Sequence, residues 1–306
     1  MLGNNQTTVT EFLLLGFTRY HPYKFWIFFL TLSVYIATVV GNLLIITLVL
    51  LSPYLKSPMY FFLSNLYVSD TIVTTNIIPN MLCVTWQDGG TISYVPCLFQ
   101  FYIHGSSSCA GCFLLTAMSY DRYLAICNPL RYTAIMEFKL CLQLGLFSWF
   151  FGFLVPVMST TMISCMEFCG TNTINHFFCD LIPLLEISCS DISFVKLEIF
   201  LVSVFVLILP PTLIILSYVY ILITVLKIPS TSGRQKVFST CSSHLTVVCV
   251  YYGTVLAIYT IPSSKTSIDT HKFLSLLYTV VTPLLNPIIY GLRSQEIRSA
   301  LSKLIG

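Results

Sequence analysis

The chain carries the stretch Met118-Ser119-Tyr120-Asp121-Arg122-Tyr123-Leu124-Ala125-Ile126-Cys127-Asn128-Pro129 at the end of a long apolar segment. Two adjacent charged side chains, Asp121 and Arg122, are costly at a membrane boundary unless they neutralise one another. The pair can also separate, and the guanidinium of Arg122 is then released to meet a partner. We therefore interpret Asp121 and Arg122 as a candidate switch.

The composition places the chain in a class. Of its 306 residues, 56% are hydrophobic and 9% are charged, whereas a soluble domain carries about 25% charged residues. Such a chain cannot cover a water-facing surface, so it is interpreted as a polytopic membrane protein whose main solvent is the lipid bilayer. The net charge of +3 and the lack of a basic tract with interleaved aromatics predict no nucleic-acid partner.

A membrane-spanning helix needs roughly 20 mostly apolar residues. Seven such stretches occur, near 26–50, 58–84, 98–121, 140–163, 194–226, 237–261 and 271–292. The segment 164–193 is too long and too rich in Cys, Asn and Asp for a tight turn, and is interpreted as a structured loop. Lipid offers no partners to unpaired backbone amides, so the spans must be helical.

The predicted fold class is an all-α membrane protein with a seven-transmembrane helix bundle. We expect a single receptor domain over residues 1–306. It comprises an N-terminal tail at 1–25, the bundle at 26–292, and a tail at 293–306 with a short amphipathic eighth helix.

The placement of Lys and Arg predicts the orientation. One face collects most of them: Lys56, Arg122, Arg131, Lys139, Lys227, Arg234, Lys236, Arg293, Arg298 and Lys303. The loops 85–97 and 164–193 on the other face contain neither residue type. The first face is therefore cytoplasmic, with the C-terminus, and the N-terminus is extracellular. Asn5-Gln6-Thr7 is then a glycosylation sequon on the correct side, and the first span serves as the targeting signal without a cleaved signal peptide.

The twelve cysteines divide into two groups. Eight lie in or beside spans and are expected to be small buried hydrophobes. The other four, Cys97, Cys169, Cys179 and Cys189, lie on the extracellular face, where disulfides persist. Four cysteines allow three pairings, and the residues alone do not choose among them. A metal site beside His176 is disfavoured because no CxxC pattern accompanies it.

Several polar groups lie inside the predicted spans. Asp70 is a carboxylate deep in the second span, and such residues are usually functional. Asn42 and Asn286 also need partners within the membrane. Pro287 removes a helical hydrogen bond one turn after Pro283, so the seventh span is weakened twice. Together these groups suggest an internal network that contains water.

One face of the third span runs from its outer third to the cytoplasmic rim. The residues on this face are His104, Ser108, Gly111, Leu115, Met118 and Arg122, at alternating steps of four and three. His104 lies less than two helical turns below Cys97. It is interpreted either as a ligand contact or as a hydrogen-bonded interior histidine.

Motifs for enzyme chemistry are missing from the sequence. It contains no GxSxG, HExxH, Walker or dinucleotide fingerprint, so we predict a non-enzyme without cofactor or bound metal. A seven-helix transporter or channel remains an alternative. It is disfavoured because transporters tend to show paired broken helices in two halves, whereas here the last span alone has strong breaks.

Five blocks resemble the olfactory receptors, a branch of the rhodopsin-like G-protein-coupled receptors. Besides residues 118–129, they are Gly41-Asn42, Pro58-Met59-Tyr60-Phe61-Phe62-Leu63-Ser64-Asn65-Leu66 followed by Asp70, Lys236-Val237-Phe238-Ser239-Thr240-Cys241-Ser242-Ser243-His244-Leu245, and Pro283-Leu284-Leu285-Asn286-Pro287-Ile288-Ile289-Tyr290. They occur in order along the whole chain at the family's spacing. The Ser-Thr-Cys-Ser-Ser-His form resembles the class II, tetrapod-type subgroup.

This resemblance implies an odorant receptor in the plasma membrane, in the cilia of olfactory neurons. It would bind a small volatile ligand within the helix bundle and couple to a stimulatory, olfactory-type heterotrimeric G protein that raises cyclic AMP. A rhodopsin-like receptor for a non-odorant metabolite, expressed elsewhere, is the nearest alternative. The resemblance also implies the disulfides Cys97–Cys179 and Cys169–Cys189.

By position in the family, the activation switch comprises Asp121, Arg122, Tyr218, Asn286, Pro287 and Tyr290, and the intramembrane Asn42 and Asp70 join it. The ligand-binding positions are His104, Gly105, Ser108, Cys109, Val202, Ser203, Val206, Tyr252, Val255, Leu256, Tyr259 and Thr279. This set is mostly apolar with a few hydroxyls and one imidazole, which suits a small hydrophobic ligand held by one or two hydrogen bonds.

Two departures from the family pattern bear on function. Gly111 stands where many members carry Glu, which weakens the expectation of a sodium site near Asp70. His104 occupies the level at which aminergic receptors carry the Asp that binds the ligand's ammonium group. Amine odorants are therefore disfavoured on the third span, and a Glu or Asp elsewhere in the pocket stays open as an alternative.

Overall fold

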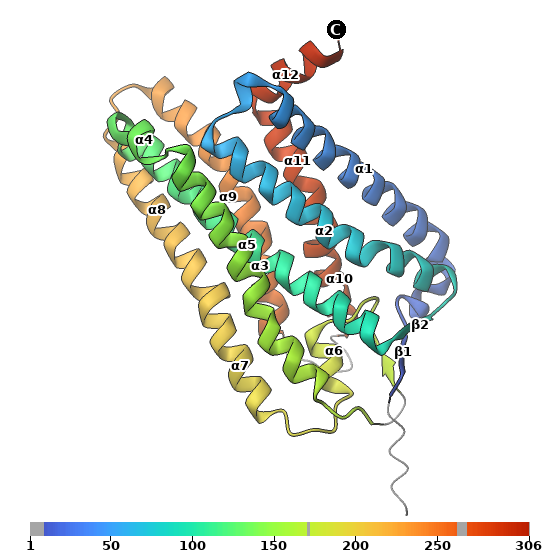
Figure 1. Cartoon of the computed structure of the whole chain (residues 1–306). Coiled ribbons are helices and arrows are strands. Elements are labelled where there is room, and N and C mark those ends of the chain that lie inside the picture. The colour runs from blue at the N-terminus through green and yellow to red at the C-terminus, as the bar shows by residue number, and fades with distance from the viewer. Residues whose placement is uncertain (1–8, 170–171, 262–267, 306) are drawn as a thin grey trace, which may run out of the picture.

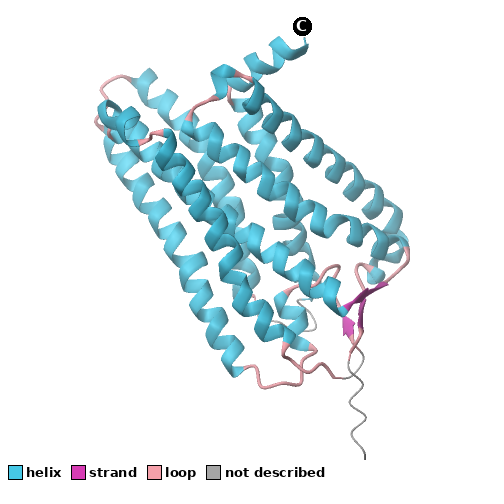
Figure 2. Ribbon diagram, viewed as in Figure 1, coloured by secondary structure: helices cyan, strands magenta, loops and turns pink. Residues whose placement is uncertain are grey.

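A computed structural model describes residues 9–169, 172–261 and 268–305 of the chain. Across these ranges, seven long helical segments form an elongated bundle (Figures 1 and 2). They are α1 (Lys24–Leu51), α2 (Pro58–Trp86), α3 (Tyr94–Cys127), α5 (Phe138–Ser164), the continuous run α7 (Ser193–Ser203), η3 (Val204–Ile208) and α8 (Leu209–Leu226), α9 (Thr231–Thr260), and the run α10 (Ile268–Leu276), η4 (Leu277–Val281) and α11 (Thr282–Arg293). The predicted seven-transmembrane helical fold is confirmed.

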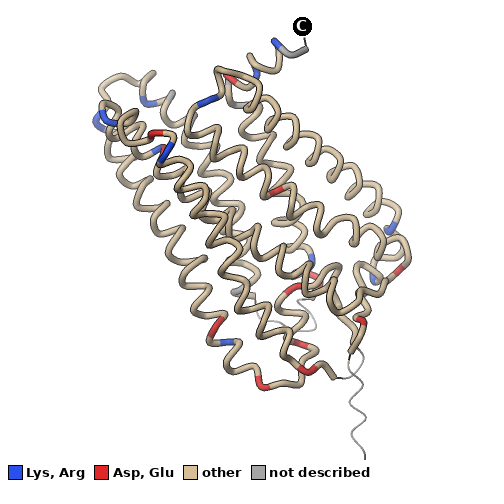
Figure 3. Tube along the Cα trace, viewed as in Figure 1, with Lys and Arg blue, Asp and Glu red and all other residues tan. Residues whose placement is uncertain are grey.

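Five of the seven segments are long and apolar enough by composition to cross a membrane. α2 and α3 are equally long but more polar, because they carry groups such as Asp70 and His104 into the interior of the bundle. Figure 3 shows most Lys, Arg, Asp and Glu residues near the two ends of the bundle. This distribution is expected for helices whose middle lies in lipid.

The third helix, α3, occupies the centre of the bundle. It packs against α2, α5, α8 and α9. Its crossing with α5 is close because α5 presents Gly152 to it. A Cβ atom at Gly152 would lie 2.7 Å from the Cβ of Ala110 on α3. No larger residue fits at this crossing without moving the two helices apart.

The cytoplasmic end of the described chain carries two short helices, α4 (Pro129–Ile135) and α12 (Gln295–Ile305). α12 comes directly after the last spanning segment and packs on α1 and the short turn η2 (Pro53–Leu55). Ile297 is buried against the bundle, and Lys303 Nζ lies 4.4 Å from the centre of the Tyr54 ring. This helix is the predicted amphipathic eighth helix.

The extracellular end is closed by a three-stranded sheet with the order β2-β1-β3. β1 (Glu11–Leu14) pairs antiparallel with β2 (Gly90–Ser93) and parallel with β3 (Thr173–Ile174). Phe12 and Leu14 of β1 are fully buried. The segment 1–25, expected as a tail, is therefore structured over β1 and the turn η1 (Thr18–Tyr23), because β1 pairs with distant loops. Asn5 lies outside the described residues.

Two disulfides anchor the long loop. Cys97 near the start of α3 is joined to Cys179, and Cys169 is joined to Cys189, which is the pairing that the family resemblance implies. Gln100 supports the first bridge: its Oε1 accepts from the backbone N–H of Cys179 at 3.0 Å. The loop then continues into the short helix α6 (Leu181–Glu186), which covers the bundle from the extracellular side.

We expect Cys97→Ser and Cys179→Ser to abolish delivery to the cell surface. The loop has little core of its own, and the bridge restricts the unfolded chain by an amount worth about 2–4 kcal/mol. Antibody staining of intact cells measures the effect. The matched control is Cys165→Ser, because Cys165 is an exposed free cysteine beside the same loop. Wild-type staining of both bridge variants would show that the bridge is dispensable.

Candidate functional site

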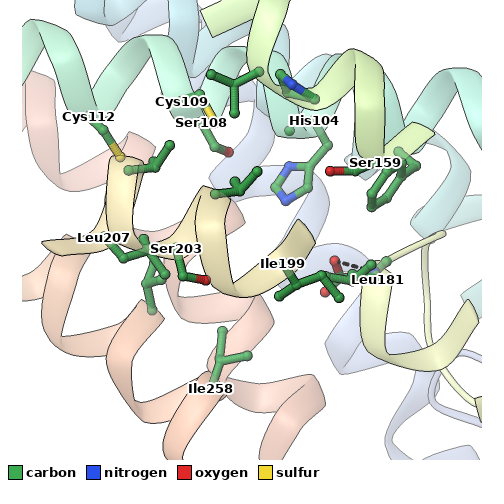
Figure 4. Close-up of a pocket in the computed structure, with 18 of the residues that line it drawn as sticks. His104, Ser108, Cys109, Cys112, Ser159, Leu181, Ile199, Ser203, Leu207 and Ile258 are labelled. Carbon is green, nitrogen blue, oxygen red and sulfur yellow. Dashed lines mark hydrogen bonds between the residues drawn. The ribbon is translucent and has the colours of Figure 1, made fainter. Parts of the chain in front are cut away.

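A cavity of about 160 Å³ lies in the extracellular half of the bundle (Figure 4). It is bounded by α3, α5, the α7–η3 run, α9 and η4, with α6 closing its extracellular side. Its lining residues are Phe101, His104, Gly105, Ser108, Cys109, Cys112, Val155, Pro156, Ser159, Asp180, Leu181, Ile182, Ile199, Val202, Ser203, Val206, Leu207, Tyr251, Val255, Ile258 and Tyr278. The wall is largely apolar with a small number of polar groups, as expected for a site that holds a small organic molecule.

Most of the sequence-derived ligand positions lie in this wall: His104, Gly105, Ser108, Cys109, Val202, Ser203, Val206 and Val255. Tyr252, Leu256 and Thr279 do not line it. The side chain of Tyr259 lies outside the described part of the structure.

On α9, the predicted and the observed cavity residues differ by a rotation about the helix axis. Tyr251, Val255 and Ile258 line the cavity at steps of four and three, which is one helix face. Tyr252 lies one residue further round and lines a groove between α9 and α8. Leu256 is 64% exposed on the outer surface of the bundle. Both faces of α9 are apolar and aromatic, so the sequence does not distinguish them.

At the last span a π-helical turn changes the phase. η4 holds Tyr278, which lines the cavity, and Thr279, which is buried but donates its hydroxyl to the carbonyl of Ser275 at 2.6 Å. A π turn inserts an extra residue into the helical repeat and rotates the residues beyond it. The family position implies Thr279, and composition does not reveal the π turn in which Tyr278 lines the cavity instead.

The polar groups of the cavity come from several elements. His104 is 6% exposed, and its Nε2 lies 2.9 Å from the hydroxyl of Tyr278. Tyr251 donates its hydroxyl to the backbone carbonyl of Ser108 at 3.1 Å, which ties α9 to α3 at the cavity wall. Ser159 and Asp180 also line the cavity. Sequence reasoning missed both, although Asp180 lies within the segment that it identified as a structured loop.

The predicted Asp121–Arg122 ion pair is present at the cytoplasmic end of α3. Asp121 is fully buried, and its second oxygen accepts from the hydroxyl of Tyr132 on α4 at 2.7 Å. Burial, and after it the Asp121 carboxylate, raises the pKa of Tyr132 above its ordinary value, so this hydroxyl stays a donor. Arg122 is therefore held by the charge of Asp121, and Asp121 is in turn fixed to α4 through Tyr132.

His244, which belongs to the sixth-span block but was given no predicted role, connects three helices. On α9, it lies with its Nδ1 2.8 Å from the hydroxyl of Tyr218 on α8. Its Nε2 lies 3.1 Å from the carbonyl of Leu115 on α3. Tyr218, a predicted switch residue, thus contacts α9 through His244.

The intramembrane polar groups gather in the middle of the bundle. Asn286 on α11 donates to the Asp70 carboxylate on α2 at 2.6 Å. Among the described residues, no protein partner is found for the side-chain polar atoms of Asn42, for Asn286 Oδ1 or for the hydroxyl of Tyr290, and all are buried. Pro287 packs beside Gly41 of α1. Buried polar atoms are nearly always hydrogen-bonded, so the expected water network stays a prediction here.

Known proteins are similar to this sequence along most or all of its length. Residues 31–306 match the sequence model of the family described as Olfactory receptor. The chain is 44% identical to human (Homo sapiens) olfactory receptor 5G3 over 306 residues, which cover 100% of this chain and 97% of that protein.

The chain belongs to the olfactory receptor family.

Two further relatives of this receptor support the assignment. Human olfactory receptor 1J4 is 46% identical over 304 residues, covering 99% of this chain and 97% of the relative. Mouse (Mus musculus) olfactory receptor 5G9 is 44% identical over 306 residues, covering 100% and 97%. The receptor is an odorant-sensing, G-protein-coupled, multi-pass plasma membrane protein and not an enzyme. Family membership decides against the transporter or channel alternative.

We expect Asp121→Asn and Tyr132→Phe to raise basal signalling, because each removes one of the two contacts that hold the ion pair. Asp121→Asn should have the larger effect, since it deletes the charge itself. Output in the absence of odorant, divided by surface expression, measures it. Glu137→Gln, an exposed cytoplasmic carboxylate on the same loop, should match the wild type. Basal output that does not change in either variant would contradict a restraining role.

Proposed function

We propose that this receptor binds a small, largely apolar volatile molecule in the cavity and activates a stimulatory, olfactory-type G protein that raises cyclic AMP. The observation that carries the proposal is the position of α9. Tyr251 of this helix forms part of the cavity wall and bonds to α3 at Ser108. Two turns toward the cytoplasm, His244 of the same helix bonds to α3 at Leu115 and to Tyr218.

A ligand that displaces Tyr251 would therefore pull on the helix that carries His244. The bonds of His244 tie α9 to its neighbours on the cytoplasmic side of the cavity. Loosening them would free the cytoplasmic half of α9 to move away from α3. That movement opens space beside Arg122 for a helix of the G protein.

The partner contact would fall to Arg122. Its guanidinium presents several donors in a fixed plane, and once released from Asp121 it can hydrogen-bond the carbonyls at the end of an inserted helix. Arg122 is already partly open to the cytoplasmic side, with 15% of its side chain exposed. The ion pair thus restrains Arg122 in the resting receptor, and the released Arg122 contacts the G protein in the active one.

We expect Arg122→Ala to abolish the rise in cyclic AMP on odorant addition while surface expression survives. A cyclic AMP reporter in cells that express the receptor, screened against a chemically broad odorant panel, measures this. Arg131→Ala is the matched control, because Arg131 is exposed on α4 and makes no ion pair among the described residues. Full signalling by Arg122→Ala would remove this residue from the switch.

We expect Ser108→Ala and Ser203→Ala to weaken odorants that carry an oxygen atom by about 2- to 12-fold each, the value of one neutral hydrogen bond. Both serines line the cavity, and Figure 4 draws their hydroxyls within it. A hydrocarbon agonist of similar shape should keep its potency. Dose–response curves at matched expression measure both, with Ser33→Ala on the outer face of α1 as the control. Equal losses for both ligands would assign the hydroxyls to the fold.

A further inference from the structure

The extracellular end of the cavity is more acidic than the sequence suggested. Figure 4 shows His104, Ser159 and Leu181 toward one end of the cavity, and Cys112 and Leu207 toward the other. Asp180 precedes Leu181 and lines the same end. The opposite end offers aliphatic side chains and thiols. The cavity is therefore polar and acidic at its outer end and apolar at its inner end.

A second carboxylate lies directly behind this end. Glu198 on α7 is 4% exposed, and its Oε1 accepts from the hydroxyl of the cavity residue Ser159 at 2.7 Å. Its Oε2 has no hydrogen-bond partner within the described residues. Because the Ser159 hydroxyl uses its hydrogen in the bond to Glu198, the Ser159 oxygen presents lone pairs toward the cavity. Ser159 thus passes the negative character of Glu198 to the cavity wall.

Neither carboxylate has a counterion among the described residues. Three cations of this end have other partners: Lys272 donates to the carbonyl of Gly16 and to Asn175, Arg19 pairs with Asp269, and Lys24 pairs with Asp88. Lys196 is exposed to the outside and forms no ion pair with either acid among the described residues. Buried charges in proteins are normally paired. Two unpaired acids at one end of a cavity therefore leave a position that suits a positive charge.

The histidines nearby do not fill this role. Asp180 also lines a small neighbouring cavity with His176, Glu186 and His271. Burial lowers the pKa of His176 to about 3, so its ring stays neutral. His271 forms no ion pair with Asp180 among the described residues, and both of its ring nitrogens lack a hydrogen-bond partner there. The Nδ1 of His104 has no hydrogen-bond partner within the described chain.

We infer that the cavity recognises small organic amines, whose ammonium group binds at Asp180 and Ser159 while the apolar body extends toward Cys112. This inference rests on the proposed function, because it names the ligand class of the same cavity. It reverses the sequence-based expectation that amines are disfavoured. That expectation rested on the third span, at His104, and left open an acid elsewhere in the pocket. The acids come from the long loop and from α7.

Asp180 has one carboxylate oxygen engaged in the fold. Its Oδ1 caps α6 by accepting from the backbone N–H of Leu181 at 2.8 Å. Burial raises the pKa of Asp180 to about 6, so at neutral pH the carboxyl is mainly ionised although the fold favours its protonated form. A raised carboxylate pKa means that the empty receptor loses stability as the pH rises through about 6. An ammonium ligand would offset that loss.

The test uses pairs of ligands with the same carbon skeleton: hexylamine and hexanol, cyclohexylamine and cyclohexanol, phenethylamine and phenethyl alcohol. Asp180→Asn keeps the oxygen that caps α6, and Asn is as good a cap as Asp. Glu198→Gln keeps the acceptor for Ser159. Asp191→Asn is the matched control, since Asp191 is an exposed carboxylate of the same loop that bonds only to Ser193 among the described residues.

Two readouts are measured for each variant. The first is the concentration for half-maximal cyclic AMP output. The second is the thermal stability of purified receptor in lipid nanodiscs with and without ligand, which does not depend on signalling. We expect Asp180→Asn to weaken the active amine by about 10- to 100-fold, the value of a hydrogen bond to a charged group, and its alcohol by less than about 3-fold. Glu198→Gln should also weaken the potency of the amine. Asp191→Asn should change the potency of neither ligand.

In nanodiscs, the amine should stabilise the wild type and Asp191→Asn but not Asp180→Asn. The empty Asp180→Asn receptor should be at least as stable as the wild type. If this variant fails to reach the surface, Glu198→Gln decides the test with the same pair of ligands. Equal shifts for amine and alcohol, or a receptor that alcohols activate and amines neither activate nor stabilise, overturn the inference and leave the proposed function standing. Amine stabilisation that Asp180→Asn abolishes, without any cyclic AMP response, supports the inference and overturns the proposed signalling.

Discussion

The constraint on which this structure depends is the absence of water from the lipid core. Backbone amides there must pair within their own helix, and polar side chains must find partners inside the bundle. Many hydroxyls comply locally by donating to a carbonyl one turn back, as Thr38 does to Val34 and Thr74 to Asp70. The groups that do not, such as Asn286, are drawn to the centre, where they meet Asp70. The polar interior of the bundle is thus a consequence of the lipid that surrounds it.

This constraint makes α3 the connection between the two functional ends. His104 and Ser108 form part of the cavity wall, Leu115 offers its carbonyl to α9, and Asp121 pairs with Arg122 at the cytoplasmic end. α9 is bonded to α3 both at the cavity, through Tyr251, and nearer the cytoplasm, through His244. In the proposed mechanism α9 acts as a lever on α3, because a displacement at Tyr251 would be transmitted along the helix to His244.

The sequence predicted what lipid dictates and missed what long-range pairing decides. The seven spans are found from their length and largely apolar composition, because the bilayer sets the length, although α2 and α3 are more polar than the other five. The strand β1 is not, because Phe12 and Leu14 gain their burial from loops far along the chain. The cavity wall contains His104 and Ser203, as their family positions imply. Tyr252 and Thr279 lie outside the cavity wall, Tyr252 by one residue of helix rotation on α9 and Thr279 within the π turn Leu277–Val281. Neither the rotation nor the π turn changes the composition, so the sequence does not reveal them.

The sequence did not reveal the strand β1 or the cavity residue Asp180, because contacts between distant parts of the chain position both. Asp180 lines the cavity because Cys179, the residue before it, is joined to Cys97 and held by Gln100, which in turn bonds to Asn76 of α2. On its other side the loop is held by β1, through the pairing with Thr173–Ile174. A loop with so little core of its own cannot hold an ionised carboxylate at a cavity wall unless both anchors are in place. The chemistry of the proposed ligand site therefore depends on the extracellular sheet and the long loop as much as on the helices. We expect changes in that sheet or loop to alter ligand preference even where no residue of the bundle changes.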